Sequence, residues 1–167
     1  MLRNRVVEKA LDELSNRTVV KPQTVQSVFC LIDLEIVDQS SWYANVQELF
    51  QLKKSKIHTV YYAPRQTKAN ANFIPLFNNR HLHWDGTLIH PMKKKVLSKK
   101  YDVLFNFFQK DNRTLQSISS HVKADFRVGY VSVDHRLNDL MLGNENHTAE
   151  QFMKTFTNFF FKITTDD

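Results

Sequence analysis

The feature that most constrains this chain is a repeated change between apolar runs of strand length and segments with helical periodicity. Three runs stand out, residues 27–33, 57–63 and 102–108, and all are rich in β-branched and aromatic side chains. Nearly continuous apolar runs are typical of strands that are buried on both faces of a parallel sheet. Strands that alternate with helices join through right-handed crossovers, which put helices on both faces. The pattern therefore predicts an α/β three-layer sandwich.

The central sheet is expected to be mainly parallel and Rossmann-like, with about five strands and the three apolar runs at its centre. A further short strand is predicted in FRVGY, which is closed by Gly129. One or two short strands are expected between residues 73 and 90, where Asn-Asn and Asp-Gly mark turns. Residues 64–72 are polar and without periodicity, which predicts a loop.

Helices are predicted where apolar residues recur every three or four positions. Ser40 and Ser41 offer an N-cap for a helix whose lysines fall in its last turn, and Asn112 and Thr148 offer caps for two later helices. The chain is long enough for one core, so we expect a single domain over residues 1–167, with the first helix packed as an appendage. The predicted helices cover residues 2–16, 42–54, 91–100, 113–122 and 148–163.

Cysteine content and hydropathy indicate the cellular setting. Cys30 is the only cysteine, so the chain can form no internal disulfide and no zinc site built from cysteines. No apolar run approaches the roughly 20 residues that cross a bilayer. Acids interrupt the N-terminal segment MLRNRVVEKALDELSNR, where a signal peptide needs an apolar stretch. We therefore expect a cytoplasmic protein without a membrane partner.

The charge distribution indicates the class of partner. The chain carries 23 basic and 17 acidic residues, a formal net charge of +6, and its lysines cluster where acids are absent. HPMKKKVLSKK predicts a helix from Pro91 with Val96 and Leu97 inward and its lysines in solvent. Such a face attracts polyanions, although a lysine run is equally typical of a solvated helix face without a partner. The candidate contacts to an anionic partner are Lys93, Lys94, Lys95, Lys99, Lys100, Arg65 and Lys68.

Aromatic residues indicate two further surfaces. Tyr61, Tyr62 and Phe73 interleave with Arg65 and Lys68, a composition that stacks bases and contacts phosphates, although both tyrosines also fit a strand core. The C-terminal helix carries more phenylalanines than one face can bury, so some are expected to form a dimer or protein-partner surface. These phenylalanines are Phe152, Phe156, Phe159, Phe160 and Phe161.

The sequence carries no recognised catalytic or cofactor motif. Phosphate cradles need glycines, but the loop DLEIVDQSS has none and the chain has three in all. Asp33 and Asp111 follow strands and are candidates for an acid and base, although single carboxylates in such places are more often caps. His81 and His83 would share one face of a strand, but no HExxH or carboxylate pattern accompanies them. We expect no catalytic residue, metal or cofactor.

Four segments in order, YDVLFNFF, KADFRVGY, LNDLMLG and AEQFMKTFTNFF, resemble a family of small bacterial proteins of unknown function. The resemblance is strongest from His83 onward and implies a full-length member, but it implies no activity. YD at residues 101–102 and RVGY at residues 127–130 are also similar to the N-terminal domain of heptosyltransferase-type (GT-B) glycosyltransferases. The glycine-bearing loop and the nucleotide-sugar-binding second domain of those enzymes have no counterpart here, so this similarity implies the fold and not the chemistry.

Two functions are consistent with these observations. The first is a non-catalytic module that docks on an anionic assembly, such as RNA, a ribosomal particle or a protein complex, through the basic helix and loops. The alternative is a single-domain glycosyltransferase-like enzyme, or a relic of one, that acts on a phosphorylated or nucleotide-linked substrate. A deep pocket at the carboxyl ends of the strands would favour the enzyme, and a flat basic face would favour the module. We favour the module.

Overall fold

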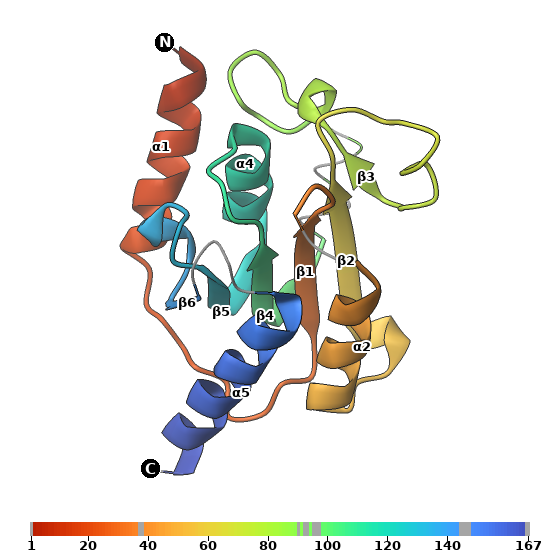
Figure 1. Ribbon diagram of the computed structural model, residues 1–167. Helices are drawn as coiled ribbons and strands as arrows, with labels where there is room; N and C mark the ends of the chain where they lie inside the picture. Colours follow the sequence, from red (N-terminus) through yellow and green to blue (C-terminus); the bar gives the residue numbers. More distant parts are fainter. Residues whose placement is uncertain are drawn as a thin grey trace.

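A parallel sheet forms the centre of the protein (Figure 1). The computed structural model describes residues 2–36, 39–89, 91, 94, 98–143 and 148–165, with the backbone alone for residues 2–4, 39–41 and 163–165. Within these residues the sheet has six strands in the order β3-β2-β1-β4-β5-β6, and every pairing is parallel. The strands are β1 Val28–Asp33, β2 Ile57–Tyr62, β3 Leu76–Phe77, β4 Lys100–Phe107, β5 Lys123–Tyr130 and β6 Leu140–Leu142.

The predicted α/β fold with a parallel, Rossmann-like sheet is confirmed, with two corrections to the strands. β1 and β4 hold the centre, whereas β2 lies one place from the edge, because only the two-residue β3 lies beyond it. β6 was not predicted, because three residues are too few to show a strand period. Of the short strands expected between residues 73 and 90, β3 is present, and HLHW and TLIH form only an isolated antiparallel bridge between Leu82 and Leu88.

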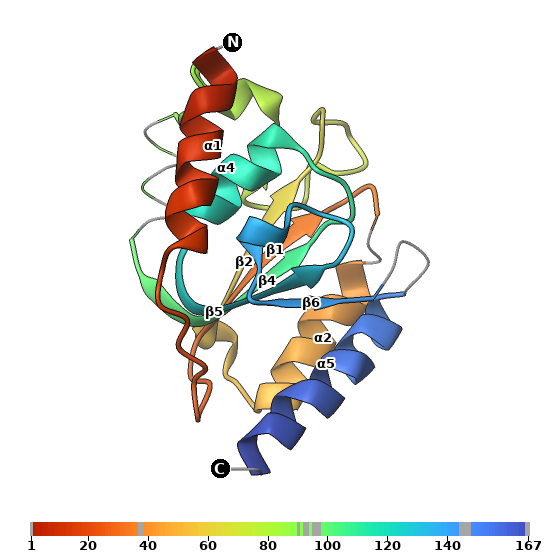
Figure 2. The same cartoon turned by 90° about the vertical axis from the view of Figure 1, so that its left-hand side faces the viewer.

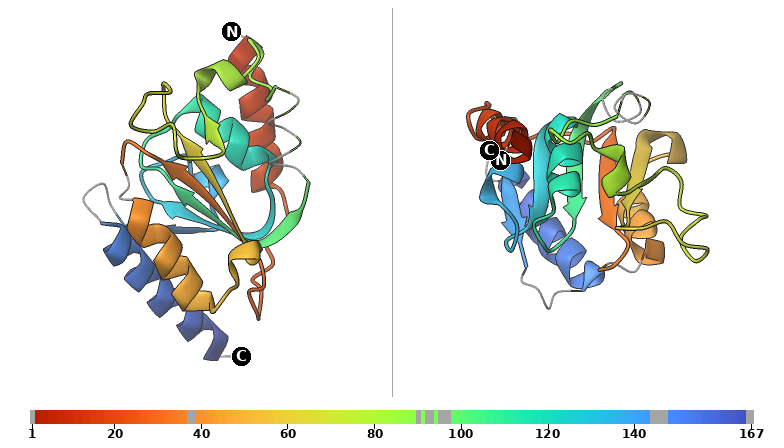
Figure 3. Two further views of the ribbon diagram at one scale, coloured as in Figure 1. Left: turned by 90° about the vertical axis from the view of Figure 1, so that its right-hand side faces the viewer. Right: turned by 90° about the horizontal axis from the view of Figure 1, so that it is seen from above.

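Helices cover both faces of the sheet, which gives the predicted three layers (Figure 2 and Figure 3). Along β1, Val28, Cys30 and Ile32 pack with α2 and α5, because successive side chains of a strand point to opposite faces. Phe29 and Leu31 pack on the other face with α1 and α4. The helices are α1 Leu2–Ser15, α2 Gln39–Phe50, α4 Arg113–His121 and α5 Ala149–Thr165, and the short 3-10 helices are η1 Lys54–Lys56, η2 Asn79–His81 and η3 His135–Leu137.

Two predicted helix caps are confirmed. The Asn112 side chain accepts hydrogen bonds from the backbone N–H groups of Thr114 (2.9 Å) and Leu115 (3.2 Å) at the start of α4. At the start of α5, Gln151 N donates to Thr148 Oγ1 (3.2 Å), and Thr148 N donates to Gln151 Oε1 (2.9 Å). This reciprocal pair is a capping box, and it fixes where the Phe-rich helix begins.

The second and third predicted helices differ from the prediction or lie partly outside the described residues. α2 ends at Phe50, so the lysines expected in its last turn lie outside it. The reason is that Gln51 adopts a left-handed conformation (φ 51°), which ends the helix and lets Leu52 N donate to Gln47 O. In the predicted helix over residues 91–100, Pro91 and Lys94 are helical, and most of the rest, including Lys93, Lys95, Val96 and Leu97, lies outside the described residues.

The first helix is a full part of one layer, although we expected an appendage. Val7 and Leu11 of α1 are buried in the same core cluster as Leu115 and Ile118 of α4. On the outer side of this contact, Arg136 donates to Glu8 Oε2 (2.8 Å) and Asp12 Oδ1 (2.7 Å). α1 therefore closes the core on the side of α4.

Candidate functional site

The strand order reverses at the carboxyl ends of β1 and β4. From β1 the chain continues to β2 on one side, and from β4 it continues to β5 on the other side. Crossovers that leave in opposite directions separate the loops above these two strands, and ligands of open α/β sheets bind at this position. Asp33 ends β1 here, and residues 108–112 follow β4. This end of the sheet is therefore the expected position of a ligand site.

A polar network lies above the carboxyl ends of β2 and β4. The Tyr62 hydroxyl donates to Asn79 Oδ1 (3.0 Å), and Asn112 Nδ2 donates to the same hydroxyl oxygen (2.9 Å). Asn79 Oδ1 also accepts from Thr114 Oγ1 (2.8 Å). The network joins η2, β2 and the first turn of α4, which are far apart in sequence, so it holds these three segments in place relative to one another.

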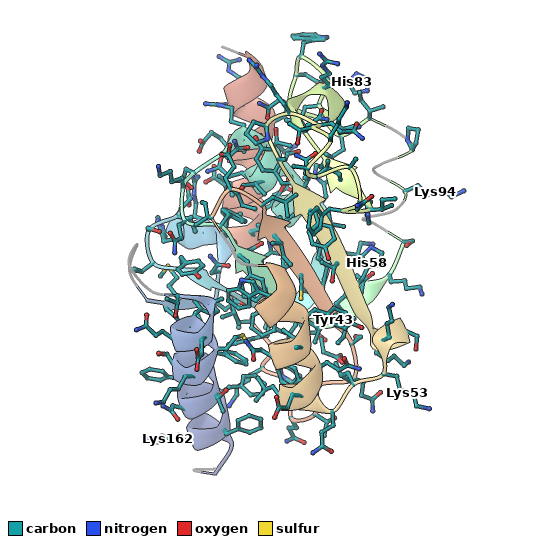
Figure 4. All side chains as sticks on the ribbon, turned by 45° about the vertical axis from the view of Figure 1, so that its right-hand side comes forward. Tyr43, Lys53, His58, His83, Lys94 and Lys162 are labelled. Atoms are coloured by element: carbon teal, nitrogen blue, oxygen red, sulfur yellow. The ribbon has the colours of Figure 1, made fainter. Side chains whose placement is uncertain are left out.

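A pocket of about 390 Å³ opens beside this network. Val7 and Leu82 provide apolar surface to it, and Asn79, His83 and Arg113 provide polar atoms. Figure 4 shows His83 at the end of the molecule towards which β2 runs, on the opposite end from Lys53. Asn79 and Arg113 were not predicted as site residues, because each stands in a turn or cap without a motif around it.

The two carboxylates considered as an acid–base pair have separate surroundings. Asp33 is 5% exposed, and burial raises the pKa of its carboxyl above the ordinary value, although Glu35 N donates to it (3.0 Å). Asp111 lines the pocket, and its Oδ1 accepts from Gln116 Nε2 (3.0 Å) and Asp134 N (2.9 Å). Asp111 Oδ1 therefore acts as a loop cap, as the sequence suggested for such carboxylates.

The histidines do not share a strand face. His81 lies in η2, where its Nδ1 accepts from Asn78 N (3.0 Å), and burial lowers its pKa. His83 lies in the following turn and lines the pocket. His58 stacks on Phe29 with 5.1 Å between ring centroids. Across the described part of the chain, no three His, Cys, Asp or Glu side chains gather as potential ligands of one metal ion.

The described basic residues among those proposed from the sequence lie at different ends of the sheet. Arg65 and Lys68 follow β2 at the carboxyl end, where Arg65 lines a second hollow of about 470 Å³ together with Glu35. Lys99 and Lys100 lie at the opposite, amino end of the sheet, beside the start of β4. Lys94 is exposed, and Lys93 and Lys95 lie outside the described residues. Residues placed at opposite ends of the strands cannot contact the same short segment of a partner.

The amino end of the sheet brings together lysines that are distant in sequence, and we call this surface the basic edge. Lys56 precedes Ile57, which pairs with Val28, and Val28 also pairs with Val103 of β4. Lys100 pairs with Lys123 at the start of β5. Figure 4 shows Lys53 beyond the amino end of β2. The exposed members of the basic edge are Lys53, Lys54, Lys56, Lys99, Lys100 and Lys123.

Acids near the basic edge are already engaged. Asp125 Oδ1 lies 2.6 Å from Lys100 Nζ, and this lysine side chain remains 64% exposed. Asp102 accepts from the backbone N–H groups of Gln26 (2.7 Å) and Ser27 (2.9 Å). Burial is the main cause that lowers the pKa of His58, and the positive charge of Lys99 lowers it further. The six exposed lysines outnumber these two carboxylates, so the basic edge carries a net positive charge.

The chain was compared with known proteins. The model of a family described as a family of unknown function (DUF6913) matches residues 2–163. The chain belongs to this family. The match confirms the resemblance to a family of unknown function, and it assigns no activity. No match was found among the curated proteins.

The RVGY segment, which carries part of the family resemblance, has a structural role. Arg127 is 1% exposed, and its guanidinium donates to the carbonyl oxygens of Leu137 (2.7 Å), Ser119 (2.8 Å) and Val122 (3.1 Å). Burial lowers the pKa of Arg127 to about 9. Gly129 leaves room for the Asn138 side chain, which a Cβ would overlap. These residues anchor the end of α4 and η3 to β5, so the segment stabilises the fold of this chain.

Several aromatic side chains considered for partner binding are buried in the core. Tyr62 is buried, and Tyr61 packs edge-on against Phe73 with 5.0 Å between ring centroids, so the interpretation as strand core is confirmed for Tyr62. In α5, Phe159 is 51% exposed and Phe161 is 43% exposed. The other three phenylalanines of the C-terminal helix, Phe152, Phe156 and Phe160, are buried.

No helix in the described residues is both long and apolar enough to cross a membrane.

Proposed function

We propose that this protein is a non-catalytic module that docks on the phosphate backbone of RNA through the basic edge. The observation that supports the proposal is the gathering of exposed lysines from the starts of β2, β4 and β5 on one side of the fold. β2 and β5 are separated by three strand spacings, which is about 14 Å. Lysines spread over this distance can contact several phosphates at once.

The chemistry of the basic edge favours backbone contact over base reading. Lysine is a flexible point charge that holds phosphate without defining a sequence. Tyr62, which was considered for base stacking, is in the core. The expected binding is therefore independent of sequence and sensitive to salt, because each phosphate contact releases condensed counterions.

Two variants with the same change of charge test this proposal. The edge variant replaces Lys54, Lys56, Lys99 and Lys123 with glutamine. Lys100 is kept because of its ion pair with Asp125. The control variant replaces four exposed lysines elsewhere with glutamine, namely Lys9, Lys68, Lys110 and Lys154.

The measurement is RNA retention over a range of salt concentrations. The log-log slope of affinity against salt should fall by about 0.9 for each lost contact to a duplex in the edge variant, and it should stay near the wild-type value in the control. Both variants should melt close to wild type, since exposed charges contribute little to stability. The proposal is wrong if wild type retains no RNA, or if both variants lose binding equally. Partners that survive nuclease treatment in a pull-down would indicate a protein complex.

A protein partner is a second candidate, supported by Phe159 and Phe161, which expose two aromatic rings on α5. Replacing both with serine should remove a nuclease-resistant partner and leave RNA retention unchanged.

The enzyme alternative is supported by the strand-end pocket alone. Cys30 is a free, buried thiol, which is consistent with the proposed setting in the cytoplasm of a bacterial cell.

A further inference from the structure

We propose that the pocket at the carboxyl end of the sheet binds a small phosphate monoester that also carries hydroxyl groups. The site is separate from the basic edge, which lies at the amino end, and does not depend on RNA binding. Three side chains with donor atoms, Asn79, His83 and Arg113, line one cavity that also has apolar surface. A few polar groups that converge in a partly apolar cavity are the usual composition of a small-molecule site.

Asn79 is held in an orientation that leaves its amide nitrogen for a ligand. Its Oδ1 accepts from both the Tyr62 hydroxyl (3.0 Å) and Thr114 Oγ1 (2.8 Å). With the oxygen engaged twice, Nδ2 is the remaining polar atom of this side chain. A donor fixed in this way loses little freedom when a ligand binds.

Arg113 is the strongest anion ligand that lines the pocket. Its guanidinium has no hydrogen-bond or ion-pair partner among the described residues, although it stands at the first position of α4. Guanidinium groups bind phosphate through two parallel hydrogen bonds, and these charge-assisted bonds are about twice as strong as neutral ones. Arg113 is therefore the phosphate ligand of the proposed site, and His83 lines the same pocket.

Asp111 also lines the pocket and favours hydroxyl groups on the ligand. Its Oδ1 is engaged by Gln116 and Asp134, so Oδ2 is the oxygen left to accept a hydroxyl hydrogen from the ligand. The same carboxylate repels a second phosphate group. The preferred ligand therefore has one phosphate near Arg113 and hydroxyl groups near Asp111.

The volume of the pocket and the hydrogen bonds of its backbone further limit the chemical class of the ligand. A volume of about 390 Å³ lies at the low end of the range for small-molecule sites, roughly 300 to 1,000 Å³, which suits a sugar monophosphate and not a dinucleotide. The amides of Thr114 and Leu115 at the start of α4 already donate to Asn112. Side chains therefore carry the recognition, and Val7 and Leu82 offer apolar contact to the carbon skeleton.

Calorimetry with a defined panel tests the proposal. Ribose 5-phosphate, glucose 6-phosphate and glycerol 3-phosphate are titrated into the full chain at low salt, beside ribose and inorganic phosphate. At least one phosphate monoester should bind more tightly than both ribose and inorganic phosphate. Arg113→Gln should weaken that binding at least about tenfold. Arg113 is exposed, so this variant should fold, and its melting curve checks that it does.

Arg65→Gln is the matched control, because Arg65 is an exposed arginine at the same end of the sheet that lines the neighbouring hollow. It should bind the ligand as wild type does. The proposal is overturned if no member of the panel binds below about 1 mM, if inorganic phosphate binds as tightly as the esters, or if Arg65→Gln loses as much affinity as Arg113→Gln. The edge variant should keep full affinity for the phosphate ester, which separates failure of this site from failure of RNA docking.

Discussion

The two ends of the sheet differ in shape and in charge. At the carboxyl end, loops and η2 rise above the strands, and a hydrogen-bonded network of Tyr62, Asn79 and Asn112 fixes the wall of a pocket that contains both a cation and a carboxylate. At the amino end, exposed lysines form a surface of positive charge. The nearby carboxylates of Asp102 and Asp125 bind the backbone N–H of Gln26 and the side chain of Lys100. A hollow with mixed polarity selects a small ligand by shape, whereas an open row of lysines attracts any polyanion.

α4 connects these two ends, since it begins at the pocket with Asn112 and ends beside the start of β5. Damage to its last turn should therefore affect both sites through the fold. Damage to its first turn should affect the pocket alone. Variants along this helix therefore test whether the two ends function independently.

Arg127→Met should have the largest effect. It removes the buried donor that serves the carbonyl oxygens of Ser119, Val122 and Leu137. Ser119 O would keep its hydrogen bond from Val122 N, but the other two carbonyl oxygens would lose the donor that Arg127 provides. We expect a loss of about 3 kcal/mol or more in the free energy of unfolding, measured by urea denaturation. Arg136→Met, at a more exposed arginine, should cost less. Near-wild-type stability of Arg127→Met would show that α4 is not anchored by this guanidinium.

Asn112→Ala should have an intermediate effect that is confined to the carboxyl end. The change removes the cap of α4 and the hydrogen bond to the Tyr62 hydroxyl, so we expect a loss of about 1 to 3 kcal/mol. Affinity for the phosphate ester should fall, while the salt dependence of RNA retention should not change. Calorimetry and RNA retention at a temperature where the variant is folded give the two readings. An equal loss at both ends would remove the distinction between them.

Asp33→Asn should have the smallest effect, and its sign depends on pH. Burial raises the pKa of Asp33 in the folded protein above the ordinary value of 3.8. The stability associated with this group is therefore complete below pH 3.8 and is lost as the pH rises through the raised pKa. Asparagine is neutral at every pH, so the variant should be slightly more stable than wild type at pH 7, and the difference should shrink towards pH 4. Denaturation midpoints across this range measure it, and a variant less stable at pH 7 would contradict the assigned cause.

Much of the architecture could be predicted from local patterns. The apolar runs that form β1, β2 and β4 are visible because a strand buried on both faces must be apolar at nearly every position. The caps at Asn112 and Thr148 are visible because their hydrogen bonds reach only two or three residues along the chain. β6 was missed because it has three residues, and the end of α2 was missed because a left-handed Gln51 leaves no mark in the sequence.

The class of fold, the positive charge and the family membership can be inferred from the amino-acid sequence, because they follow from composition, periodicity and order along the chain. Which lysines share a surface depends on the tertiary structure. Arg65 and Lys99 are both basic residues of polar segments in the sequence, but they lie at opposite ends of the sheet. Lys56 and Lys123 lie at the same end, because β1 and β4 pair in parallel between the strands that these lysines precede or begin. The pocket also depends on the tertiary structure, since Asn79, His83 and Arg113 line one cavity only after strand pairing brings their segments together. Strand order is set by burial and pairing over the whole sheet, and a linear pattern does not contain that information.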